Sequence, residues 1–182
     1  VSSLPLLRLG DAPPLRSAEF LDLSQYHLPP RLQEELTAIS LLPRERHCCP
    51  AEAGWNDFEL ALRNAVVRAR ASRQSREAQP FLKLEAAAFG FLESQIQDAF
   101  NRDPLRLEEE LDHLRWRVLD DLIVGRDYDF DRLFVYRIKL LLLEKRAGLD
   151  TDAGKQQTRE QLNQKLESSE LLADIIGSTA TG

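Results

Sequence analysis

The densest group of residues that could do chemistry is His47-Cys48-Cys49. Histidine and cysteine bind zinc, but a structural zinc site needs about four ligands, usually supplied as two spaced pairs. No second pair is present in the sequence. A cysteine nucleophile would also need a base and an orienting group close to the thiol. We therefore interpret these residues as part of a plain loop, and a helical enzyme that uses His47 or Cys48 stays an alternative.

A second group consists of four carboxylates in the first turns of a predicted helix: Glu108, Glu109, Glu110 and Asp112. The helix dipole favours acidic residues at this end. A carboxylate metal site would take a Glu-x-x-His spacing from each of two helices. Glu110 and His113 provide one such spacing, and nothing repeats it. The pattern favours a solvated face, and an enzyme that uses these carboxylates is the alternative.

A third group is basic and contains five arginines: Arg63, Arg68, Arg70, Arg73 and Arg76. A separate triplet, Arg115-Trp116-Arg117, places an aromatic ring between two cations. RNA or anionic lipid could use such a surface. The net charge of -6 and the pI near 5.2 argue against a general nucleic-acid binder. We expect either a solvated face or a protein-binding patch, and the residues predicted to bind a partner are Arg63, Arg70, Arg115, Trp116 and Arg117.

The sequence contains no Gly-rich phosphate loop, and Gly125-Arg126 is expected to be a turn. We assign no catalytic, metal-binding or cofactor-binding residue, and we expect a protein that is not an enzyme and needs no cofactor. Two adjacent cysteines make a poor disulfide framework, which indicates a reducing compartment. No signal peptide or membrane-spanning segment is visible in the sequence.

The element expected to organise these residues is a helix over residues 129–147, with apolar side chains around most of its circumference. Such a helix is buried by several neighbours or inserted in a bilayer. Its longest uninterrupted apolar run is Leu140–Leu143, far shorter than the roughly 20 residues of a membrane span. The pattern predicts an all-α, multi-helix bundle around this buried helix, with Leu141 in its core.

The other predicted helices cover residues 17–26, 31–42, 55–72, 81–100, 104–124 and 153–176, and Gly148 is expected to end the central helix. No segment shows convincing strand alternation. Residues 1–177 are predicted to form a single helical domain, with a linker near 74–79 and a tail over 178–182.

Two segments resemble a known family: VSSLPLLRLGDAPPLRSAEFLDL (residues 1–23) and FDRLFVYRIKLLLLEKRAGLDTDAGK (residues 130–155). They are similar to an uncharacterised bacterial family that is encoded among the subunits of V/A-type rotary ATPases. That family looks like a shortened C (or d) subunit, the helical funnel that couples the central stalk to the membrane ring. It provides no catalytic residues to assign here.

The resemblance implies a cytoplasmic accessory or coupling component of a V/A-type ATPase. Such a component binds stalk or ring subunits, has no membrane span of its own, and is peripheral to the inner membrane through the ATPase. A free-standing helical adaptor that binds an unrelated protein is the alternative. Neither function involves nucleic acid.

Overall fold

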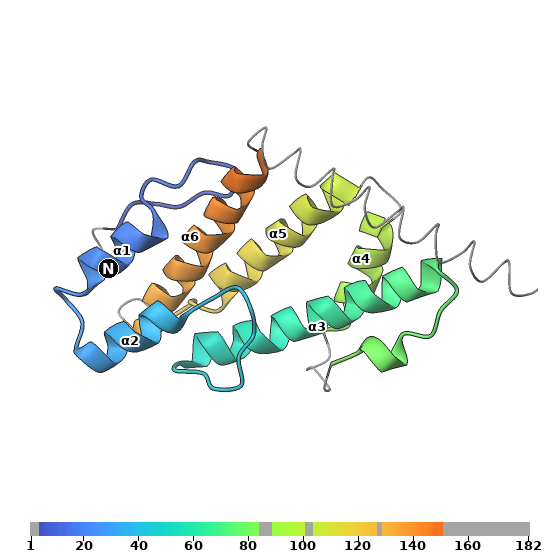
Figure 1. Cartoon of the computed structure of the whole chain (residues 1–182), viewed down its shortest axis with the longest axis horizontal. Helices are drawn as coiled ribbons and strands as arrows, with labels where there is room; N and C mark the ends of the chain where they lie inside the picture. Colours follow the sequence, from blue (N-terminus) through green and yellow to red (C-terminus); the bar gives the residue numbers. More distant parts are fainter. Residues whose placement is uncertain (1–3, 84–88, 101–103, 127–128, 151–182) are drawn as a thin grey trace, which may run out of the picture. The chain divides into compact units, whose positions relative to one another are not determined.

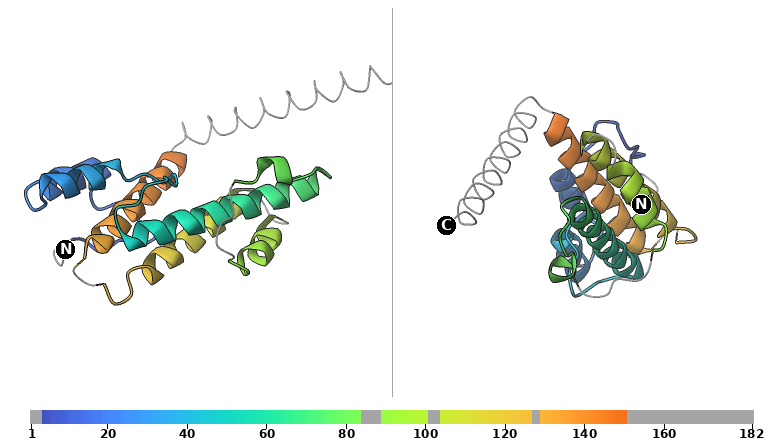
Figure 2. Two further views of the ribbon diagram at one scale, coloured as in Figure 1. Left: turned by 90° about the horizontal axis from the view of Figure 1, so that it is seen from below. Right: turned by 90° about the vertical axis from the view of Figure 1, so that its right-hand side faces the viewer.

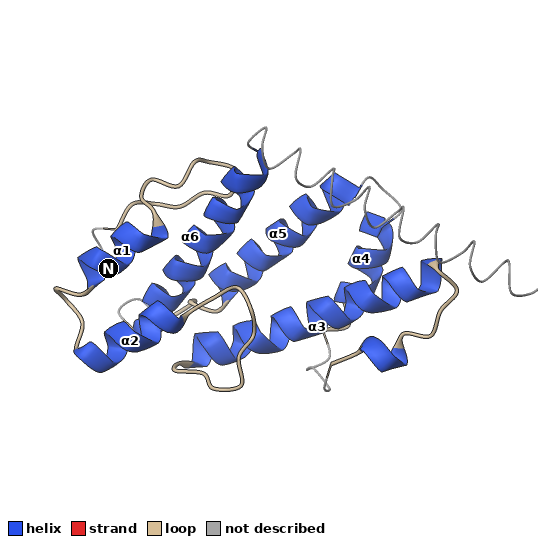
Figure 3. Ribbon diagram, in the orientation of Figure 1, coloured by secondary structure: helices blue, strands red, loops and turns tan. Residues whose placement is uncertain are grey.

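The computed structural model describes residues 4–83, 89–100, 104–126 and 129–150, and their regular secondary structure is helical with no strand among them (Figures 1 and 3). The elements in chain order are α1 (Ser17–Ser24), α2 (Pro30–Ala38), α3 (Pro50–Arg73), the 3-10 helix η1 (Gln79–Phe81), α4 (Leu92–Phe100), α5 (Pro104–Asp121) and α6 (Phe130–Asp150). The predicted all-α, multi-helix bundle is confirmed.

Helix α3 is the longest helix of the described part, and α4 and α5 pack against it (Figure 2). Its buried face presents Trp55, Phe58 and Leu62, each at most 1% exposed. Buried alanines recur along the same helix, and because their side chains are small, neighbouring helices can approach closely. The central contact between the three helices is therefore a well-filled apolar core.

Helix α6 lies between α1 and α5 (Figure 1). Tyr136 of α6 stacks against Phe20 of α1 with ring centroids 5.1 Å apart. On the side facing α5, Lys139 Nζ lies 2.5 Å from Asp120 Oδ1. Ile138 and Leu140 are fully buried. This part of α6 thus packs against several neighbours, as its apolar circumference predicts.

The first helices and the segment before them cover one side of α6. Leu7 is buried, and the hydroxyl of Tyr136 donates a hydrogen bond of 3.1 Å to the carbonyl of Pro5. Helices α1 and α2 are joined by Ser24, whose hydroxyl lies 2.8 Å from Gln33 Oε1. The extended segment before α1 is thereby fixed onto α6.

Several predicted boundaries are wrong. Helix α3 begins at Pro50, although the sequence predicted a loop as far as Gly54. Within the helix predicted over residues 81–100, α4 is present, residues 82–83 and 89–91 are not helical, and residues 84–88 lie outside the described residues. Gly148 does not end α6, which continues to Asp150. Leu141 is only partly buried, whereas Leu140 and Leu142 are buried.

The other helix boundaries differ less from those predicted. Helix α1 ends at Ser24, α2 at Ala38 and α5 at Asp121, each a few residues before the predicted end. The turn predicted after α5 is present, and Gly125 adopts a φ of 78°, a conformation that glycine tolerates best. The helix predicted over residues 153–176 and the tail over 178–182 lie outside the described residues.

The chain divides into two compact units, Val1–Leu143 and Glu144–Gly182. All contacts discussed below lie within the first unit. The single domain over residues 1–177 stays a prediction. Within the described ranges, no helix has both the length and the apolar character that crossing a bilayer requires.

Candidate functional site

A buried ion-pair network joins α3 to α5. The Glu59 side chain is 2% exposed and accepts hydrogen bonds from Arg115 Nε at 3.0 Å and Arg115 Nη2 at 3.1 Å. Arg63, one turn along α3, pairs with the same carboxylate at 3.1 Å. Arg115 also donates to Asp112 at 3.0 Å. Two acids and two guanidinium groups therefore balance one another between the helices.

The neighbouring carboxylates keep Arg115 in its protonated, charged form. Burial by itself would lower the pKa of Arg115, but the carboxylates of Glu59 and Asp112 raise it above its ordinary value. A bidentate pair between arginine and a carboxylate also fixes the relative orientation of the two side chains. The network is thus a structural brace between α3 and α5.

The residues predicted to bind a partner differ in how far they are exposed to solvent. Arg63 and Arg115 meet at Glu59, and Arg115 is turned inward with 13% of its side chain exposed. Trp116 is half-buried, and Lys139 Nζ lies 4.6 Å from the centroid of its ring. Arg70 and Arg117 are exposed on α3 and α5. Partner binding by these residues stays a prediction.

The loop that carries the cysteines is attached to α3 through Glu52, whose side chain is 3% exposed. Arg44 pairs with both oxygens of Glu52, and the backbone N–H of Cys48 donates to Oε2 at 2.7 Å. Burial would raise the pKa of the Glu52 carboxyl, but the hydrogen bonds from Arg44 and Cys48 lower it below its ordinary value. Glu52 therefore serves as an ionised anchor for the loop.

The two thiols are not activated. Burial, followed by the nearby carboxylate of Glu52, raises the pKa of Cys48 well above its ordinary value. Burial likewise raises the pKa of Cys49 to about 11. Since the thiolate is the nucleophile and the metal ligand, both groups are weak in either role at neutral pH. His47 is exposed on the same loop.

The acidic group on α5 divides between two environments. Asp112 is buried in the network with Arg115. Glu109 and Glu110 line a polar cleft of about 630 Å³, together with Asp98 of α4 and His113. No group of three or more histidine, cysteine or acidic side chains in the described part of the chain is arranged to hold a metal ion.

Asp131 of α6 supplies a cap for α3 from outside that helix. Cys49, the residue before α3, makes no capping hydrogen bond with its own side chain. Instead, Asp131 Oδ1 accepts the backbone N–H of Ala51 at 2.5 Å, and Oδ2 accepts a hydrogen bond of 2.9 Å from Arg126 Nη1. A carboxylate at this position satisfies an N–H with no partner in the helix and matches the helix dipole.

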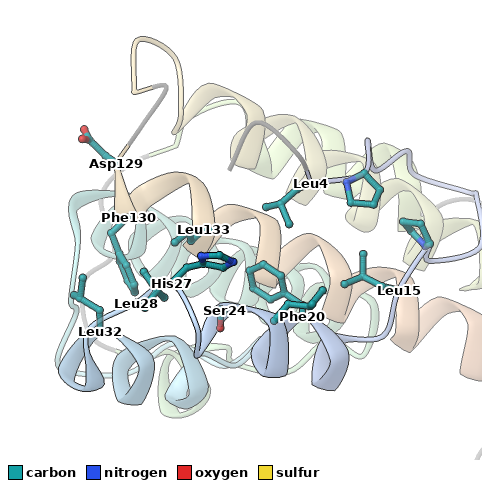
Figure 4. Close-up of a pocket in the computed structure, with 13 residues that line it drawn as sticks. Leu4, Leu15, Phe20, Ser24, His27, Leu28, Leu32, Asp129, Phe130 and Leu133 are labelled. Carbon is teal, nitrogen blue, oxygen red and sulfur yellow. The ribbon is translucent and has the colours of Figure 1, made fainter.

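An apolar groove of about 630 Å³ lies between α1, the segment before it, and the start of α6 (Figure 4). We call it the α1–α6 groove. Most of its lining is apolar, and the residues that define it are Leu15, Phe20, Leu23, Leu28, Phe130 and Leu133. Asp129 lies at one end, beside Phe130 (Figure 4). This groove is a second candidate for recognition of another molecule.

The sequence analysis missed the residues that make the braces. The spacing of Glu59 and Arg63, four apart on a helix, is a visible signal for one ion pair. The bonds of Glu59 to Arg115 and of Asp131 to Ala51 join residues 56 and 80 positions apart. No local pattern reports these two pairings, so the contacts of Glu59 with Arg115 and of Asp131 with Ala51 could not have been predicted from the sequence.

Together, the fold and these contacts define an all-helical body in which several of the described buried charges join helices to one another or to a loop. Residues 84–169 match a family model described as a protein of unknown function (DUF2764). The match includes residues 130–155 of the resemblance described above, and residues 1–23 lie outside it. No curated protein matches the chain, and no solved structure matches it.

Proposed function

We propose that this protein is a non-catalytic accessory or coupling component of a bacterial V/A-type ATPase that binds subunits of the stalk or the membrane ring. The observation that supports a non-catalytic role is that its buried acids are paired with cations. Glu52, Glu59 and Asp131 each hold a cation from another part of the chain. Acids neutralised in this way act as structural supports.

A helical body held rigid by ion pairs suits a component that couples other subunits or keeps them in place. Arg115 joins α5 to α3, Asp131 joins α6 to the start of α3, and Lys139 joins α6 to α5. Because these contacts are buried or partly buried, solvent ions screen them less than they screen exposed pairs. The same body leaves the α1–α6 groove as a surface for recognition.

The choice of partner rests on sequence resemblance. Residues 1–23 and 130–155 resemble the family encoded among V/A-type ATPase subunits, and this supports a stalk or ring subunit as the partner. The same resemblance supports a cytoplasmic location, peripheral to the inner membrane through the ATPase. The family description that matches residues 84–169 names no activity and no partner.

Co-purification from the native host tests the proposal. An affinity-tagged copy at its normal level should enrich stalk or ring subunits of the ATPase from solubilised membranes, as measured by quantitative mass spectrometry. A Leu140→Asp variant, which places a charge at a fully buried position, should lose this enrichment. Enrichment of unrelated proteins alone, with the ATPase subunits absent, would favour the free-standing adaptor.

A further inference from the structure

The segment before α1 covers one side of α6 through few contacts, and we call its residues 4–15 the strap. Leu7 is the buried residue of the strap, whereas Leu6 beside it is 77% exposed. Within the described ranges, one hydrogen bond joins the strap to another element, from the Tyr136 hydroxyl to the carbonyl of Pro5. A segment with few buried apolar side chains and few hydrogen bonds opens at a lower free energy than the helices around it.

Unfilled space lies beside the strap in two places. Leu4 and Leu15 line the α1–α6 groove (Figure 4). Leu4 and Pro5 also line a second cavity of about 210 Å³ toward α5, together with Val135 of α6. Leu4, Leu9 and Leu15 pack against the core but stay partly exposed. Apolar side chains beside unfilled space lose part of the dispersion contacts that a close-packed interior provides, so the strap is held less firmly than the helices.

The strap has local structure that does not depend on α6. The N–H of Asp11 donates to the carbonyl of Arg8 at 3.2 Å, and Gly10 has a φ of 99°, as the third residue of a type II turn requires. The strap also contains three prolines, each of which fixes one backbone φ. Because a restricted segment has less conformational entropy to lose, the strap can dock onto α6 again after it has left.

We propose that the strap is a releasable cover: it detaches from α6 while the helices stay folded, and its release exposes the side of α6 that carries Val135 and Tyr136. Val135 is 2% exposed while the strap is docked, and it lines the second cavity together with Leu6 and Leu7 of the strap. The strap thus controls access to this side of α6. The inference rests on the strap alone and does not depend on the ATPase assignment.

A buried thiol measures the release. Val135→Cys places a thiol next to the strap, where a thiol reagent reaches it only when the strap opens. Ala65→Cys is the matched control, since Ala65 of α3 is 5% exposed and lines neither cavity. Mass spectrometry separates the new site from Cys48 and Cys49, and circular dichroism checks the helical content of each variant. Relative to its rate in the unfolded chain, Val135→Cys should be labelled at least about tenfold faster than Ala65→Cys.

Low concentrations of urea distinguish release of the strap from unfolding. Urea promotes an opening in proportion to the surface that the opening exposes. The labelling rate of Val135→Cys should therefore change little between water and about 1 M urea, because only the strap moves. The labelling rate of Ala65→Cys should rise by roughly fivefold or more over the same range, because α3 must unfold.

Two adjacent leucines of the strap test its anchor. Leu7→Ala removes the buried side chain and should accelerate labelling of Val135→Cys by at least about tenfold. Leu6→Ala is the matched control and should change that rate by less than about twofold, since Leu6 is exposed. Acetylation of the Tyr136 hydroxyl in chains without the cysteine substitution is a second measurement and should follow the same order. Tyr26, which is 79% exposed, should react equally in both variants.

Two results would overturn the proposal. A labelling rate for Val135→Cys that is no faster than that of Ala65→Cys, or that rises as steeply with urea, would mean that the strap leaves α6 only when the helices unfold. Equal effects of Leu7→Ala and Leu6→Ala on both the thiol and Tyr136 would mean that the strap does not control access to α6.

Discussion

Glu59 is the residue whose charge holds α3 to α5, and its replacement should destabilise the fold. Glu59→Ala removes the carboxylate that two guanidinium groups share and leaves Arg115 buried without its main partner. Breaking a buried ion pair by removing one partner costs about 3–5 kcal/mol. Urea denaturation should therefore show a loss of this size in the free energy of unfolding.

Arg63→Ala serves as the control for that experiment. Arg63 contacts the same carboxylate, but 38% of its side chain is exposed, so its ion pair is screened by water and should contribute less than about 1 kcal/mol. If the two substitutions cost the same, the buried pair with Arg115 does not dominate the network.

Glu52 should make stability depend on pH. Its pKa is lower in the folded protein than the ordinary value of about 4.3, so the folded state binds the proton less readily than the unfolded state. This stabilisation is fully present above the ordinary pKa and is lost as the pH falls through the lowered folded value. The advantage of the wild type over Glu52→Gln should therefore shrink below about pH 4.3.

Chemical denaturation at a series of pH values measures that difference. Glu34→Gln, at an exposed position of α2, should change little across the same range. A constant difference between the wild type and Glu52→Gln from neutral pH down to about pH 3 would mean that the carboxylate is not the anchor of the loop.

Sequence reasoning judged individual residues only by their near neighbours. It interpreted the cysteines as part of a loop, and the structure places Cys48 in the loop and Cys49 immediately before α3. It treated Arg115 as a surface group because its partner, Glu59, lies on another helix. It also did not use the local spacing of Glu59 and Arg63. Partners distant in sequence are set by packing, which no local spacing reports.

Asp131 gives the start of α3 a cap that belongs to α6, and Asp131→Ala should weaken both helices. Losing a capping side chain costs about 0.5–2 kcal/mol. Thermal unfolding should show a lower midpoint, and amide exchange at Ala51 should accelerate. Unchanged exchange at Ala51 would show that the hydrogen bond from its N–H to Asp131 does not protect the end of the helix.

Two adjacent leucines of α6 provide a matched test of how this helix is buried. Leu140 is fully buried, and Leu140→Ala should cost about 2–5 kcal/mol. Leu141 is only partly buried, so Leu141→Ala should cost clearly less, because less apolar surface returns to water. The free energies of unfolding from urea titration check the order, and a reversed order would mean that α6 is rotated about its axis.

Helix type was easier to predict than helix boundaries. Helix α6 was found because its apolar pattern is long and dense. The start of α3 was missed because Gly54 resembles a breaker, whereas in the helix it lets Leu122 approach closely: an added Cβ would lie 2.5 Å from Leu122 Cδ2. The helix predicted over residues 81–100 is confirmed at Leu92–Phe100 and is wrong at residues 89–91, where apolar spacing was given more weight than Gly90.

The described part of the molecule is an all-helical body. Its all-α class follows from apolar spacing, which each helix displays locally. The α1–α6 groove could not be predicted, since it arises from the way the segment before α1 and the start of α6 come together. The choice of partner likewise cannot be predicted from single helices, because it depends on surfaces that several elements form jointly.

The measurement that tests this account most directly is purification of the native V/A-type ATPase through one of its own stalk subunits, followed by quantitative mass spectrometry. We predict that this protein copurifies in a constant ratio to the stalk subunits and that the Leu140→Asp variant does not. Its absence from the purified ATPase, while the wild-type protein is present and folded in the same cells, would contradict the proposed function.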